Sequence, residues 1–196
     1  MKILFTFIIP AFVAAFGLLS LAKPLEERQS SGKPFNLYAY GEGIPGLQVF
    51  YADGQAQIGD MSLSNASNKV PMYVTYSDND SLTWMAHANT TQSSRLAFKA
   101  TGTTSTTNLL CLKQGNSMTN PVIFTGINTG TSTTEEGGII TETWSLYGSN
   151  VLLTQPNGNF YAKSTGKNGW WQLVWSTSQS AGLEAIPIAL RTNPPV

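Results

Sequence analysis

Cysteine and histidine are nearly absent from this sequence, which excludes several kinds of site. Cys111 is the only cysteine among 196 residues, so no intramolecular disulfide forms and the fold depends on core packing. Its apolar neighbours Leu110 and Leu112 predict a buried, inert thiol. His87 is the only histidine, which excludes a two-histidine metal site and leaves one residue for any Ser-His-Asp arrangement. No Gly-x-Ser-x-Gly elbow accompanies it, so we expect a polar residue without a catalytic role, and no metal or cofactor.

Charge is also scarce. Only 11% of the residues are charged, with 11 basic and 11 acidic side chains, so no basic field is available to hold nucleic acid. Ser, Thr, Asn and Gly solubilise the chain instead, as in many extracellular proteins. Asn-x-Ser/Thr sequons begin at Asn65, Asn79 and Asn89, and the cluster predicts N-glycosylation in the secretory pathway.

Apolar residues at helical spacing are missing from residue 35 onward, whereas short alternating runs recur between turn signals. This pattern predicts an all-β single domain, a β-sandwich or barrel of about ten to twelve short strands without disulfides. Asp53-Gly54 predicts a type I′ hairpin turn. Residues 77–80 form another predicted hairpin tip, and residues 128–138 a surface loop. Strands are expected at 35–40, 47–52, 55–58, 72–76, 82–86, 96–100, 109–113, 121–126, 143–147, 151–155, 160–163, 170–175 and 184–191.

The beginning of the chain has the three parts of a signal peptide. Lys2 is followed by an apolar run and by the small-x-small pattern Ser20-Leu21-Ala22. An uncleaved membrane anchor is the alternative, since the run approaches the about 18 residues of a span. We therefore expect a signal peptide over 1–22, a flexible leader over 23–34, a β domain over 35–192 and a tail over 193–196. The mature protein then begins at Lys23 or, after trimming, near Gln29.

Aromatic residues concentrate in the last third of the chain. Period-two alternation places Trp171, Leu173 and Trp175 on one face of a strand, expected inward, and Trp170 on the other face with Gln172. Trp170 is thus the tryptophan expected to be exposed and able to stack on a sugar ring, although large aromatics are foremost core material. The candidate ligand-binding residues are Trp170, Tyr161 and Tyr147.

Carboxylates provide the remaining candidates for chemistry. Glycoside hydrolysis needs two of them across the scissile bond. Glu142 and Glu184 each lie beside a predicted strand and are the first to examine. Such pairs occur by chance in any chain, so we assign no catalytic residue.

The order of features resembles the small secreted PhiA-type cell-wall proteins of filamentous fungi. The likeness is carried by Phe35-Asn36-Leu37-Tyr38-Ala39, by Thr143-Trp144-Ser145-Leu146 leading into Val151-Leu152-Leu153, by Gly169-Trp170-Trp171-Gln172-Leu173, and by an apolar strand after Gly182-Leu183-Glu184-Ala185. The chain departs from the family in lacking cysteines that its members carry, so shared disulfides are not expected. The resemblance implies a β-sandwich-like protein of the fungal surface or medium, with no catalytic residues to transfer.

These observations together predict a secreted, non-enzymatic cell-wall or extracellular protein of a fungus. A carbohydrate-binding module is the alternative, and a secreted glycoside-active enzyme comes third. Cell-wall polysaccharide is the expected partner, with no nucleic acid and no membrane after signal cleavage, and we expect a monomer.

Overall fold

Antiparallel strands are the main secondary structure of the protein, for which a computed structural model describes residues 33–77, 80–89, 98–100, 103–105, 107–126, 138–178 and 184–196. The predicted signal peptide, most of the leader, the Asn79 sequon and residues 128–137 of the predicted loop lie outside these residues. No helix in the described part is long and apolar enough to cross a membrane. The elements are β1 (Tyr38–Gly41), β2 (Ile44–Ala52), β3 (Gln55–Gly59), the 3-10 helix η1 (Met61–Leu63), β4 (Lys69–Tyr76), β5 (Trp84–Ala88), β6 (Phe98–Ala100), β7 (Thr103–Ser105), β8 (Thr107–Lys113), β9 (Asn120–Gly126), β10 (Ile139–Ile140), β11 (Trp144–Tyr147), β12 (Asn150–Leu153), β13 (Asn159–Ser164), β14 (Trp170–Ser176) and β15 (Ala185–Arg191).

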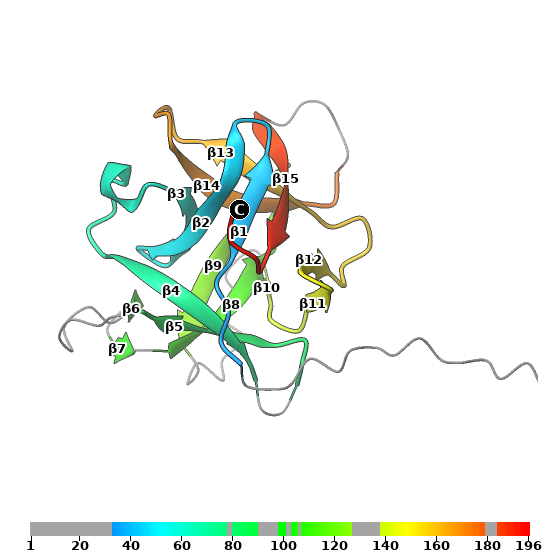
Figure 1. The fold of residues 1–196 in the computed structure, drawn as a ribbon. Helices are drawn as coiled ribbons and strands as arrows, with labels where there is room; N and C mark the ends of the chain where they lie inside the picture. Colours follow the sequence, from blue (N-terminus) through cyan, green and yellow to red (C-terminus); the bar gives the residue numbers. More distant parts are fainter. Residues whose placement is uncertain are drawn as a thin grey trace, which may run out of the picture.

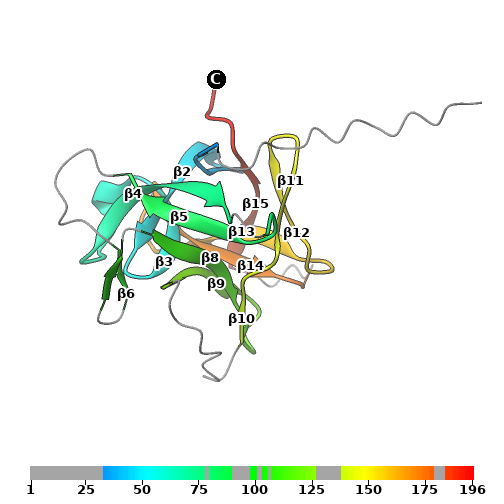
Figure 2. The same cartoon turned by 90° about the horizontal axis from the view of Figure 1, so that it is seen from below.

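Ten of these strands close into an antiparallel barrel (Figure 1), which confirms the predicted all-β fold. Their order is β1-β2-β4-β5-β8-β9-β3-β14-β13-β15, and β15 returns to β1 through pairs such as Tyr38 with Arg191. Figure 2 shows β4, β5, β8 and β9 running side by side along one wall. Closure matters because it leaves the barrel strands without the open edges at which sheets pair with other chains.

Three further pieces lie beside the barrel. The β11–β12 hairpin joins β15 through the pair Asn150 and Arg191, and β10 pairs with the end of β8. The short β6–β7 hairpin forms its own two-stranded sheet. The strand prediction included neither β10, whose two residues are too few to show a period, nor β7, which lies between the strands expected at 96–100 and 109–113.

Turn chemistry follows the sequence at the β2–β3 hairpin. Asp53 and Gly54 both have positive φ, 45° and 86°, which confirms the predicted turn. The Asp53 carboxylate accepts hydrogen bonds from the backbone N–H groups of Ser67 and Asn68, both at 2.8 Å. The turn thereby fixes the segment that leads into β4.

Two glycines allow β3 and β14 to approach closely. Gly59 has a φ of 109°, and a Cβ at this position would overlap the carbonyl oxygen of Gly169. The same carbonyl accepts a hydrogen bond of 2.9 Å from the Asp60 N–H. Only glycine fits here, because both the conformation and the space exclude a side chain.

Apolar and aromatic side chains fill the barrel interior. The rings of Trp84 and Trp144 stack with centroids 5.2 Å apart, and Trp144 also stacks on Phe160 at 5.9 Å. Trp144 comes from β11, outside the barrel wall, yet it is fully buried and its indole N–H donates to the Leu110 carbonyl at 2.7 Å. The β11–β12 hairpin is therefore anchored by a tryptophan inserted into the core. Strand alternation supplies the surrounding layer, which includes Val49, Tyr51, Ile58, Val74, Leu110, Leu112, Leu173 and Leu190.

Candidate functional site

Trp170 does not form the exposed platform that its sequence position predicts. Its face of β14 is indeed opposite to the inward face, which carries Leu173, Trp175 and the half-buried Trp171 as expected. Trp170 is nevertheless only 7% exposed, because it packs with Phe50 and Ala52 in a second apolar cluster beneath Met61 and Ala66. The segment that contains η1 and Ala66 thus covers this part of the outer wall. The prediction that Trp170 is exposed is wrong.

Polar contacts hold Trp170 in this covered position. Its indole N–H donates to Gln57 Oε1 at 2.6 Å, and its carbonyl accepts from the Thr165 hydroxyl at 2.7 Å. The Lys167 ammonium lies 5.6 Å from the ring centroid, within the range of a cation–π contact. Trp170 is therefore a structural residue of the wall.

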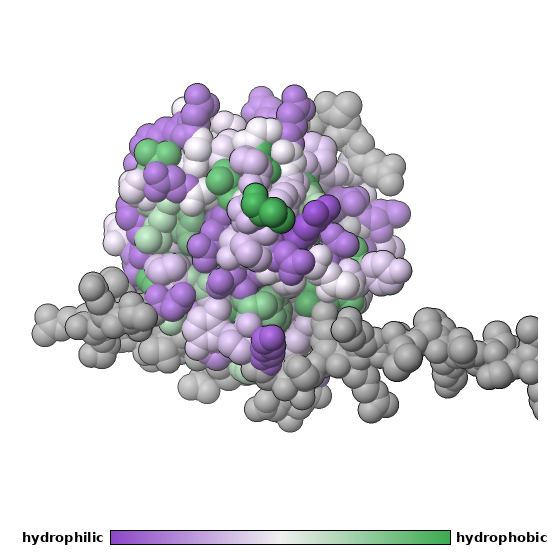
Figure 3. Space-filling view, viewed as in Figure 1, coloured by the Kyte–Doolittle hydropathy of each residue, from purple (hydrophilic) through white to green (hydrophobic). Residues whose placement is uncertain are grey.

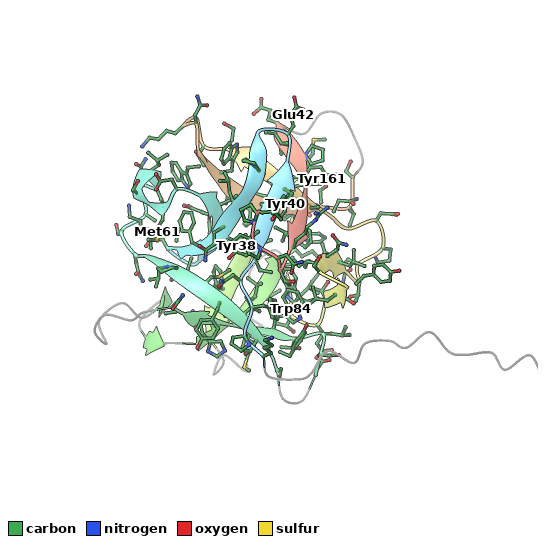
Figure 4. The ribbon with its side chains drawn as sticks, viewed as in Figure 1. Tyr38, Tyr40, Glu42, Met61, Trp84 and Tyr161 are labelled. Carbon is green, nitrogen blue, oxygen red and sulfur yellow. The ribbon has the colours of Figure 1, made fainter. Side chains whose placement is uncertain are left out.

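Tyr161 is likewise buried. Its ring is 7% exposed, and its hydroxyl donates to the Ser178 carbonyl at 3.1 Å. Met61, which packs beside Trp170, and Tyr161 are separated in Figure 4. The register places Tyr161 opposite Val174, four residues along β14 from Trp170. The structure therefore shows Tyr161 as a buried residue, whereas its predicted role in ligand binding stays a prediction.

Tyr147 is the predicted ligand-binding residue that the structure leaves accessible. It ends β11 and is 77% exposed, and Leu152 on the paired strand is 48% exposed. The register pairs Ser145 with Leu152 and Tyr147 with Asn150, which places Tyr147 and Leu152 on one outer face of the hairpin. The opposite face, with Trp144 and Val151, enters the core.

His87 lies on the outer wall of β5 and contacts two side chains of β4. Its imidazole stacks on Tyr73 with centroids 4.9 Å apart, and Nε2 is 2.8 Å from the Thr75 hydroxyl. Burial lowers the pKa of His87, because desolvation disfavours the imidazolium. The described part of the chain contains no group of three or more His, Cys, Asp or Glu residues able to hold a metal ion.

The two carboxylates selected from the sequence occupy different surroundings. Glu142 is exposed just before β11. Glu184 is exposed and lines a polar hollow of about 500 Å³ together with Lys163 and the turn between β8 and β9. Glu142 does not line this hollow, and the structure does not bring the two carboxylates into one site.

Cys111 is fully buried, as predicted, and burial raises the pKa of its thiol to about 12. The thiol is therefore protonated and inert at ordinary pH.

The sequence did not predict the burial of Asn108, which lies two residues before Leu110 on the inward face of β8. It is fully buried, and neither of its side-chain amide atoms has a hydrogen-bond partner.

Two of the predicted glycosylation sites lie within the described residues, and both are exposed. The Asn65 side-chain oxygen accepts a hydrogen bond of 2.9 Å from Lys167 Nζ. Asn89 follows β5 and lines a small hollow with Tyr73 and Phe35. Sequence reasoning found the sequons but missed this hollow, although alternation over 71–75 and 85–89 already places Tyr73 and Asn89 on the same face.

Comparison with known proteins adds no relative to this description: no protein-family profile matches the chain, and no curated protein or solved structure is significantly similar to it.

Proposed function

We propose that this protein is a secreted, non-enzymatic protein of the fungal cell wall or culture medium, and that it meets its surroundings through the outer surface of the barrel. The observation that carries this proposal is the filled interior. Some barrels of eight strands hold a small ligand in their interior, whereas the interior of this one holds the stacked rings of Trp84, Trp144 and Phe160. Recognition is thereby left to the outer wall.

The surface has the character expected of such a role. The face in Figure 3 is mostly hydrophilic, with small apolar patches. Only 11% of the residues of the chain are charged, and Asn65 and Asn89 present exposed side chains in sequons. A surface of this kind is solubilised by neutral polar groups and glycans rather than by charge.

Fractionation of a producing fungal culture tests the proposal. We expect the protein in the medium or the washed wall fraction, beginning at Lys23 or near Gln29 by N-terminal sequencing. Recovery from membranes or cytosol with Met1 intact would refute it. Incubation of the purified protein with wall glycans should release no sugar, and release would favour the glycoside-active alternative.

A carbohydrate-binding role is the second candidate, favoured by the exposure of Tyr147. A tyrosine ring that stands free of the core presents an apolar face on which a pyranose can stack. Leu152 extends that face along the hairpin. Trp170 and Tyr161 play no part in this version, because both are covered.

The binding role is tested by retention on chitin, β-glucan and cellulose. Wild type and Tyr147→Phe, which keeps the ring, should be retained alike, whereas Tyr147→Ala should lose retention. An equal melting temperature for the three proteins would show that the loss is not unfolding. If wild type is retained by none of the polysaccharides, the binding role fails while the wall or secretome role stands.

A further inference from the structure

A small hollow on the outer wall of the barrel lies beside one of the sequons. Its volume is about 290 Å³, and it is lined by Pro34, Phe35, Asn36, Tyr73 and Asn89. Pockets for drug-sized molecules occupy about 300–1,000 Å³, so this hollow has room for one sugar ring rather than for a chain. Three of the five lining residues present apolar or aromatic side chains.

The backbone fixes Asn89 at this hollow. Asn89 directly follows β5, and its N–H donates to the Pro71 carbonyl at 2.8 Å. Strand alternation gives Asn89 the same outward direction as His87, which is directly opposite Tyr73 in the register. The sequon Asn89-Thr90-Thr91 therefore starts at a residue whose side chain already lines the hollow.

The lining groups match the chemistry of an N-acetylglucosamine ring. Tyr73 is held against the wall by its stacking on His87, at an interplanar angle of 12°, so its ring is fixed in place. The C–H face of a pyranose packs on apolar and aromatic surfaces, which Tyr73 and Pro34 supply, whereas the Phe35 ring also packs on Trp84 and Tyr76. Asn36 is held at the edge of the hollow by a hydrogen bond of 3.5 Å from its side-chain nitrogen to the Tyr38 hydroxyl.

We propose that this hollow seats the first N-acetylglucosamine of an N-glycan attached to Asn89, with the sugar ring packed against Tyr73. The proposal rests on the secreted function, because the glycan is attached in the secretory pathway. Asn65 provides the matched contrast. It is also an exposed sequon asparagine, but its side-chain oxygen is bonded to Lys167 and it does not line this hollow.

The test uses the full chain secreted from a yeast host, with occupancy of each sequon read by glycopeptide mass spectrometry. Thr91→Val and Ser67→Ala each remove one glycan while keeping the asparagine. Loss of the Asn89 glycan should lower the melting temperature by about 2–4 °C, the usual scale of one modest interaction in a domain of this size. Loss of the Asn65 glycan should leave the melting temperature unchanged. Trimming wild type to single N-acetylglucosamine residues with an endoglycosidase should also leave it unchanged.

The contribution of Tyr73 is isolated by a double-mutant cycle. In a Tyr73→Ala background, Thr91→Val should no longer lower the melting temperature. Since Tyr73→Ala could itself fail to fold, nuclear magnetic resonance of the trimmed wild type gives a second reading: protons of the Asn89 sugar should be shifted upfield by the Tyr73 ring.

Three outcomes would overturn the inference. An occupied Asn89 whose glycan changes neither the melting temperature nor the proton shifts would place the sugar in solvent. Occupancy at Asn65 with none at Asn89 would show that the hollow seats no glycan. Retention of Met1 with no glycan at any sequon would refute the secreted function itself, and the inference with it.

Discussion

The barrel interior and the outer wall beneath η1 both bury tryptophans, but by different physical means. Trp84 and Trp144 are surrounded on all sides by strands and by each other. Trp170 lies on the far face of β14, where strand alternation alone would leave it in solvent, and a single connecting segment with Met61 and Ala66 covers it. Alternation therefore tells which face a residue occupies, whereas its exposure depends on what packs over that face.

The largest loss in the free energy of unfolding is expected for a tryptophan inside the barrel. Trp144→Ala removes the ring between Trp84 and Phe160 and also the hydrogen bond to the Leu110 carbonyl. We expect a loss of about 3–5 kcal/mol in the free energy of unfolding, the usual cost of a large-to-small core change. Urea denaturation measures it. A loss comparable to that of a surface substitution would show that the hairpin tryptophan is not part of the core.

Cys111 tests the burial of β8 with a smaller change. Cys111→Ser places a hydroxyl in a fully buried position and should cost about 1–3 kcal/mol if it finds no partner. The wild-type thiol should react with a bulky maleimide only as fast as the protein opens. Rapid labelling of the native protein would contradict the burial of this residue.

His87 predicts a pH dependence of stability. Its pKa is lowered in the folded state, so the unfolded state, with a pKa near 6.5, binds more protons as the pH falls through that value. The contribution of neutral His87 to the free energy of unfolding is therefore fully present above a pH of about 6.5, and it is lost as the pH falls toward the pKa of the folded state. His87→Gln should remove this component. Hydrogen bonds from Ser62 lower the pKa of Asp60, so its titration changes the free energy of unfolding only below about pH 4. An identical pH profile for His87→Gln between pH 5 and 7 would contradict the assignment.

The smallest effect on the free energy of unfolding is expected at Tyr147, over which nothing in the described part of the chain packs. Tyr147 is exposed and lies on the hairpin face away from the core, so Tyr147→Ala should change the free energy of unfolding by no more than about 0.5 kcal/mol. Chemical denaturation beside the wild type measures the difference. A loss of several kcal/mol would mean that the ring packs on the molecule rather than standing free of it.

Local patterns carried the sequence prediction as far as strands and faces. The all-β class, the Asp53-Gly54 turn, the inward set of Leu173 and Trp175, and the buried Cys111 all follow from spacing and neighbouring residues. The burial of Trp170 does not follow from local patterns, because the residues that surround it are far away in the chain. Its indole N–H, for example, donates to Gln57, 113 positions away. The hollow at Asn89 likewise depends on residues 34–36 meeting β4 and β5, which strand pairing decides.

The most direct test of this account is the thermal melt of Trp170→Ala. If η1 buries the ring, the substitution removes a covered apolar side chain and should cost about 1.5–3 kcal/mol, less than a core tryptophan but far more than Tyr147. Trp170→Phe, which keeps a ring under Met61, should recover much of the loss. A melting temperature unchanged from wild type in Trp170→Ala would show that the ring is exposed, and that the outer wall of β14 is open as the sequence alone predicts.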